Sequence, residues 1–123
     1  MTTKSWFERK DFACKCGCGY DTVDYELMTV LNSIREHFGV PLVITSGCRC
    51  EVHNKNEGGS KKSKHMYGTA ADFRPTWNNP RFHELLTEIH EYLLIKYSDK
   101  YGIAIGDTFV HIDIRPNPAR WTY

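Results

Sequence analysis

Two stretches of the chain repeat apolar residues at the three- and four-residue spacing of an amphipathic helix. The first predicts a helix over residues 22–38, which either Asp21 or Thr22 can cap and Gly39 can end. The second begins at Asn79-Pro80, where Asn suits the cap and Pro the first helical position. The apolar stripes are Val23, Leu27, Val30, Leu31, Ile34 and Phe38 in the first helix, and Phe82, Leu85, Leu86, Ile89, Leu93 and Tyr97 in the second.

Short runs of β-branched residues predict strands between and after these helices. We expect strands over 42–45 and 69–73, then a hairpin whose strands, 103–105 and 108–114, flank the turn dipeptide Gly106-Asp107. Helices and short strands without βαβ alternation indicate an α+β fold with an antiparallel sheet packed against helices. The 123 residues suit a single domain over 1–123, in which residues 1–20 form a Cys-rich N-terminal segment.

The last predicted strand and the segment after a long loop carry the candidate chemistry. Residues 47–68 read as a loop rich in Gly, Asn, Lys and Ser, and loops of that length are usually functional or disordered. Because side chains alternate along a strand, one face of 108–114 carries Phe109, His111 and Asp113, and the other carries Val110, Ile112 and Ile114. Asp72 lies within an apolar strand, where a carboxylate is costly unless it is paired or binds a metal. Together with His65, Asp72 and His111 offer two imidazoles and a carboxylate, donors that zinc accepts.

Three blocks of the sequence resemble peptidase family M15, the zinc D-Ala-D-Ala carboxypeptidases that share their fold with the hedgehog signalling domain. The most specific block is Ser63-x-His65-x-x-Gly68-x-Ala70-x-Asp72. The segment 45–50 is similar to the family's Ser-Gly-x-Arg segment, and 109–115 is similar to its terminal His-x-Asp-x-Arg strand. The blocks keep the family's order and cover roughly residues 20–115. The resemblance is greatest to compact single-domain members, among them phage endolysin peptidases.

The resemblance implies one catalytic zinc ion bound by His65, Asp72 and His111, with a zinc-activated water as the nucleophile. It also implies that Arg49 binds the substrate's carbonyl or carboxylate group, with Ser46 in the same pocket.

The general base is a separate question. Many members place an acidic residue three positions before the last His, where this chain has Thr108. We predict that Asp113 serves as the catalytic base. Two alternatives stay open: Asp113 orients a histidine ligand, or Asp107 is the base.

The function that the resemblance implies is hydrolysis of peptide bonds in the stem peptides of bacterial peptidoglycan. The enzyme would be a D-Ala-D-Ala carboxypeptidase or a peptidoglycan endopeptidase of the endolysin type. The alternative is a non-catalytic, zinc-containing binding domain on the same fold.

Charge and hydropathy limit the classes of partner that we expect for this protein. Sixteen Lys and Arg against fifteen Asp and Glu give a net charge of +1, which argues against nucleic acid as a partner. No stretch is apolar enough for a membrane span or a signal peptide. We therefore expect a monomer without a membrane partner, synthesised in the cytoplasm and acting on the cell wall after release.

Five cysteines are many for a chain of this length, and their number is odd. Three interpretations stay open: reduced thiols, disulfides between the two clusters after release into an oxidising space, or a second, structural zinc. The Cys-x-Cys spacing is tighter than that of most zinc knuckles. The clusters are Cys14, Cys16 and Cys18, and Cys48 and Cys50.

Overall fold

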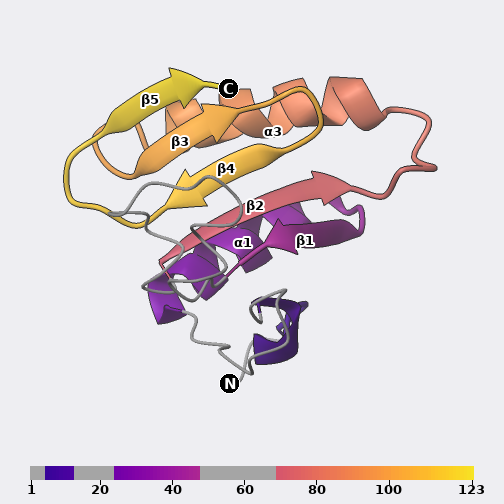
Figure 1. Cartoon of the computed structure of the whole chain (residues 1–123), viewed down its shortest axis with the longest axis horizontal. Coiled ribbons are helices and arrows are strands. Elements are labelled where there is room, and N and C mark those ends of the chain that lie inside the picture. The colour runs from indigo at the N-terminus through magenta and orange to yellow at the C-terminus, as the bar shows by residue number, and fades with distance from the viewer. Residues whose placement is uncertain (1–4, 13–23, 48–68) are drawn as a thin grey trace.

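The computed structural model describes residues 5–12, 24–47 and 69–123, and five strands within them form one sheet in the order β1-β2-β4-β3-β5 (Figure 1). Neighbouring strands are antiparallel except β3 and β5, which run parallel. The α+β fold class is confirmed, but the expectation of a wholly antiparallel sheet is wrong, because the C-terminal segment returns alongside β3. The strands are β1 (Leu42–Ser46), β2 (Ala70–Pro75), β3 (Gly102–Ile105), β4 (Val110–Asp113) and β5 (Ala119–Thr122).

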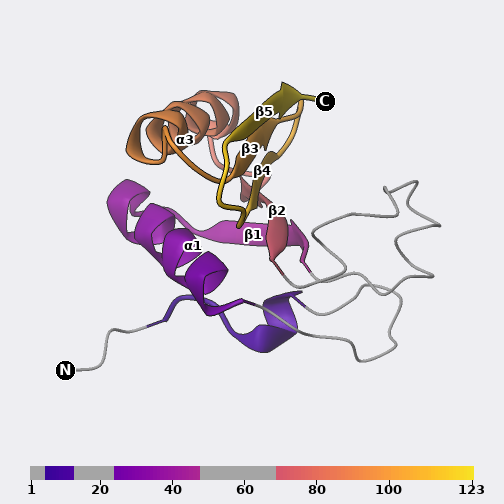
Figure 2. The ribbon, with the colours of Figure 1, turned by 90° about the vertical axis from the view of Figure 1, so that its left-hand side faces the viewer.

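The first predicted helix, α1, spans Tyr25–Phe38 and lies on the same face of the sheet as the second helix (Figure 2). It begins later than predicted because Asp24 is its cap: a carboxylate oxygen of Asp24 accepts a hydrogen bond from the Leu27 backbone N–H at 3.1 Å. The predicted end is confirmed, since Gly39 adopts the left-handed conformation at φ 64°.

The second predicted helix, α3, spans Phe82–Lys96 and begins after the predicted Asn79-Pro80 start. Asn79 does not cap it. The Asn79 side chain instead accepts a hydrogen bond from the Arg81 backbone N–H at 2.9 Å, within the turn that precedes the helix. The residue at the cap position is Arg81, whose side chain makes no capping hydrogen bond.

The hydrophobic core fills the space between the two helices and one face of the sheet. Alternate residues of β2 and β4 point into it: Ala71, Phe73, Val110 and Ile112 are fully buried among the helix stripes. The residues between them, including Asp72 and His111, therefore lie on the opposite face. We call that second face the polar face of the sheet.

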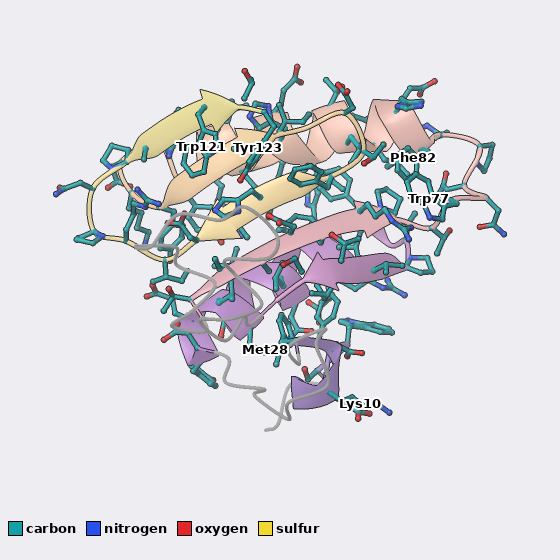
Figure 3. All side chains as sticks on the ribbon, viewed as in Figure 1. Lys10, Met28, Trp77, Phe82, Trp121 and Tyr123 are labelled. Atoms are coloured by element: carbon teal, nitrogen blue, oxygen red, sulfur yellow. The ribbon has the colours of Figure 1, made fainter. Side chains whose placement is uncertain are left out.

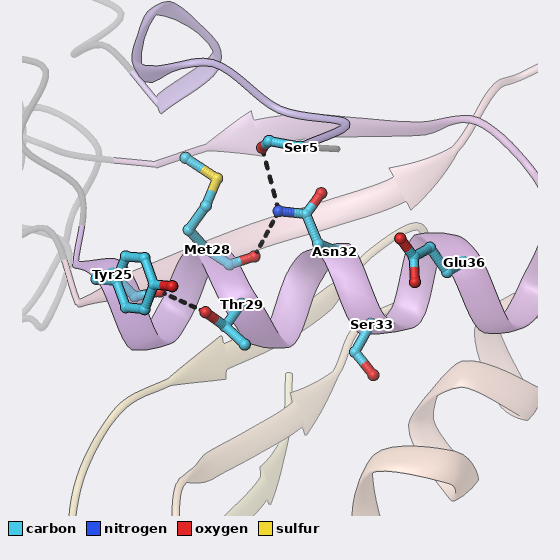
Figure 4. A pocket seen from close by; sticks show the side chains of 7 residues that line it. All are labelled: Ser5, Tyr25, Met28, Thr29, Asn32, Ser33 and Glu36. Atoms are coloured by element: carbon cyan, nitrogen blue, oxygen red, sulfur yellow. Dashed lines mark hydrogen bonds between the residues drawn. The ribbon is translucent and has the colours of Figure 1, made fainter. Parts of the chain in front are cut away.

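An N-terminal segment packs against α1 on the helix side of the molecule. Phe7 and Phe12, the latter in the short 3₁₀ helix η1 (Arg9–Phe12), are buried in the core. The Asn32 side-chain amide donates a hydrogen bond to the Ser5 hydroxyl at 3.1 Å, beside a hollow of about 330 Å³ (Figure 4). This hydrogen bond links the N-terminal segment to the middle of α1.

Several predictions fall on residues outside the described ranges. They concern Arg49, His65, the loop 48–68 and all five cysteines, and they stay predictions. Neither α1 nor α3 has the length and apolar character needed to cross a lipid bilayer, and the same holds for every helix in the described ranges.

Candidate active site

Strand pairing brings three of the predicted site residues into one row across the polar face. Asp72 on β2 pairs with His111 on β4, and Ser46 on β1 is the partner of Asp72 on its other side. Residues paired across an antiparallel sheet have Cβ atoms about 4.5–5.5 Å apart. The pairing register alone therefore brings together residues that are 26 and 39 positions apart in the sequence.

The His111 ring lies between two carboxylates. Its Nδ1 is 2.8 Å from Oδ1 of Asp72, and its Nε2 is 2.8 Å from Oδ2 of Asp113. The imidazole is buried, with 4% of His111 exposed. Burial disfavours the charged ring, but the hydrogen bonds to Asp113 and Asp72 outweigh burial and raise the pKa of His111.

Asp113 has no exposed surface, and both of its carboxylate oxygens are engaged. Besides the contact with His111, it accepts two hydrogen bonds from Arg115, from Nε at 2.5 Å and from Nη2 at 2.6 Å. Burial alone would raise the pKa of Asp113, yet the hydrogen bonds from His111 and Arg115 lower it to about 2. Asp113 is thus a fixed anion that holds the ring of His111.

The space for this carboxylate comes from Gly102, which pairs with Asp113 across β3 and β4. A Cβ atom at position 102 would collide with both oxygens and with the carboxyl carbon of Asp113. No signal in the sequence marks this glycine, since the need for it arises only from the register of the two strands.

Replacing Gly102 with alanine is therefore expected to displace Asp113 from His111 and Arg115. We expect the free energy of unfolding to fall by about 1–3 kcal/mol, as in other overpacked cores. Urea unfolding of the variant and the unmodified protein measures this loss. In a chain that already carries Asp113→Ala, Gly102→Ala should lower the free energy of unfolding much less. An equal loss of stability with and without Asp113→Ala would contradict the proposed collision.

Two C-terminal aromatic residues, Trp121 on β5 and Tyr123 just after it, complete the surroundings of His111, and the sequence analysis missed both. The Trp121 ring lies 5.1 Å from the His111 ring, and Arg115 stacks over Trp121 at 5.6 Å. Tyr123 follows at 6.3 Å from His111, and Figure 3 shows it beside Trp121. The alternation of Trp121, Thr122 and Tyr123 after Pro118 is a short strand signal that could have revealed β5.

The structure thus brings Asp72, His111 and Asp113 into contact, with Ser46 in the same row, while Asp107 is exposed in the turn between β3 and β4. Within residues 5–12, 24–47 and 69–123, no three His, Cys, Asp or Glu side chains form a group that could hold a metal ion. The predicted ligand set needs His65, which lies outside those ranges.

The two described donors of that set nevertheless fit a zinc ion. Nδ1 of His111 and Oδ1 of Asp72 are 2.8 Å apart, within reach of one ion whose bonds to nitrogen and oxygen are about 2.0–2.2 Å. The other ring nitrogen of His111 faces a carboxylate, as is usual for metal-binding histidines. Both donors are of types that zinc accepts.

Comparison with known families identifies the family of the chain. The sequence profile described as Peptidase M15 matches residues 5–113. The chain belongs to the peptidase M15 family. Peptidases of this family are generally zinc-dependent. The match of this M15 chain ends at Asp113, so β5 with Trp121 lies beyond it. None of the curated proteins matches the chain.

Proposed function

We propose that this M15 chain is a zinc metallopeptidase that hydrolyses peptide bonds in the stem peptides of bacterial peptidoglycan. The observation that carries the proposal is the contact between Asp72 and His111, supported on its far side by Asp113. Membership of a peptidase family supplies the reaction class. The sequence blocks that resemble D-Ala-D-Ala carboxypeptidases support the choice of substrate.

In this proposal His65, Asp72 and His111 hold one zinc ion. The chemistry that zinc supplies in such sites is Lewis-acid activation of a water molecule and of a carbonyl group. Nδ1 of His111 is the donor, because it is the ring nitrogen that faces Asp72. Asp113 keeps the proton of His111 on Nε2 and fixes the orientation of the ring.

For Asp113 we favour the orienting role over the role of general base. A base must come within hydrogen-bond distance of the proton that it accepts. Asp113 is fully buried, and its oxygens already accept hydrogen bonds from Arg115 and His111. Asp107, exposed in the turn before β4, remains the alternative base.

The substrate is a peptide with at least one carboxylate near the bond that is cut. Arg49 and Ser46 are the proposed binding residues, and the Cα pairing of Ser46 with Asp72 supports the second. The bond is either the terminal D-Ala-D-Ala bond or one inside the stem peptide. We propose that the protein acts as a monomer on the cell wall after release from the cell.

Incubation with purified peptidoglycan tests this function. We expect the zinc-loaded protein to release D-Ala if it is a carboxypeptidase, or to create new amino termini if it is an endopeptidase. A chelator should stop either reaction, and added zinc should restore it. Peptidoglycan that stays intact after long incubation with protein that holds one zinc per chain would contradict the proposal and favour a zinc-containing binding domain.

A further inference from the structure

Arg74 lies on the polar face of the sheet, two residues beyond Asp72 along β2. Its neighbours Phe73 and Pro75 are buried, whereas Asp72 and Arg74 are partly exposed, as strand alternation requires. At about 3.3 Å per residue, the Cα atoms of Asp72 and Arg74 are separated by about 7 Å. Arg74 therefore lies beside the proposed zinc site, about two residues of an extended peptide away from it.

The guanidinium group of Arg74 is held in a fixed orientation. Its Cζ lies 4.0 Å from the centre of the Trp77 ring, and Nη1 donates a hydrogen bond to the Pro75 carbonyl at 3.0 Å. Trp77 in turn stacks on Phe82, with ring centres 5.0 Å apart and planes 19° from parallel, as Figure 3 shows at the end of β2. A stacked, planar fork loses little further freedom when it binds a ligand.

The charge of Arg74 has no partner within the described ranges. Two other arginines there have carboxylate partners: Arg81 contacts Glu84 and Glu88, and Arg115 contacts Asp113. For Arg74, the hydrogen bond to Pro75 is the only one that the described residues provide. Its remaining N–H groups can donate hydrogen bonds to a planar anion, and a carboxylate fits such a fork through two parallel hydrogen bonds.

The surface next to this group has room for a peptide. Trp77 is 63% exposed, and it lines a hollow of about 410 Å³ together with Arg81, Phe82 and Thr108. Thr108 belongs to the turn that leads into β4 and His111. The exposed ring on which Arg74 stacks thus borders open space.

We propose that Arg74 is a second anion-binding residue of the proposed active site, which binds a free carboxylate of the substrate peptide about two residues from the bond that is cut. The inference rests on the proposed function, and it deepens it: the preferred substrate is an acidic peptide whose carboxylate is not amidated. Arg49 is the predicted partner of the group at the cleaved bond, so the two arginines have different roles.

Two synthetic peptides test this inference. Both are L-Ala-γ-D-Glu-L-Lys-D-Ala-D-Ala, with the α-carboxyl group of the glutamyl residue either free or amidated. For Arg74→Gln we expect kcat/KM on the free acid to fall by about 10- to 100-fold, mainly through KM, because hydrogen bonds between charged groups are lost. The same variant should leave the amidated peptide unaffected. Arg74→Lys, which keeps the charge but not the fork, should recover part of the loss.

Arg35→Gln is the matched control, because Arg35 also stacks on a tryptophan, with its Cζ 4.2 Å from the centre of the Trp6 ring, but lies on α1, on the other face of the sheet. It should change neither peptide's kinetics. Equal cleavage of both peptides by the unmodified protein, or an equal loss on both in Arg74→Gln, would overturn the role of Arg74 and leave the proposed function intact.

Calorimetric binding of the same two peptides separates the inference from the proposed function. We expect the unmodified protein to bind the free acid more tightly than the amide, and Arg74→Gln to lose this preference. Binding with that preference but without cleavage of the peptide or of peptidoglycan would support Arg74 as the anion-binding residue and overturn the hydrolytic function. Binding without any preference would overturn the role of Arg74.

Discussion

Replacing His111 with alanine is expected to abolish zinc retention and peptide hydrolysis together. The change removes the nitrogen that faces Asp72, and it leaves Asp72 and Asp113 without the ring that separates them. A metal contributes several kcal/mol to the stabilisation of the transition state, so hydrolysis should fall by about 10³-fold or more. Metal analysis of the purified variant and its rate of D-Ala release or of new amino termini measure the two losses.

A matched control and a milder variant keep this prediction testable. His37→Ala removes an exposed histidine of α1, on the other face of the sheet, and it should keep zinc and activity. Asp72→Asn keeps the size of the side chain and should lose zinc as His111→Ala does. Circular dichroism shows whether each variant is folded. A folded His111→Ala protein that retains one zinc per chain would exclude His111 as a ligand.

The local patterns of the sequence were sufficient to predict the helix and strands that position the site residues. The apolar stripe from Leu27 to Ile34 and the alternation around His111 predicted α1 and the faces of β4 correctly. An isolated carboxylate in an apolar strand, Asp72, also pointed to a paired group. These features are local, so a periodicity of 3.6 or 2 residues reveals them.

Features that depend on contacts between distant segments could not be predicted in the same way. The parallel pairing of β5 with β3 places Trp121 on His111, and nothing near residue 121 encodes the register of that pairing. Gly102 is required only because Asp113 lies across from it. The direction of the His111 ring, with Nε2 toward Asp113, likewise depends on two strands and on Arg115. The role of Asp113 therefore needed the structure.

Replacing Asp113 with asparagine is expected to weaken zinc binding and to lower stability. The variant leaves Arg115 without its anion and removes the carboxylate that holds His111. Loss of one member of a buried ion pair costs about 3–5 kcal/mol, and loss of a carboxylate that supports a histidine ligand lowers metal affinity by about 10- to 100-fold. Urea unfolding and zinc titration against a competing chelator measure these two effects.

The same variant distinguishes an orienting Asp113 from a catalytic base. If Asp113 orients His111, saturating zinc should return kcat of Asp113→Asn to within about 10-fold of the unmodified protein, because the ligand is weakened but present. If Asp113 is the base, kcat should stay lower by about 10²- to 10⁴-fold at any zinc concentration. Asp107→Asn tests the alternative base, and it should affect stability little because Asp107 is exposed. Full zinc affinity in Asp113→Asn combined with a loss of kcat well above 100-fold would overturn the orienting role, because a carboxylate that acts through a histidine ligand changes activity by about 10- to 100-fold.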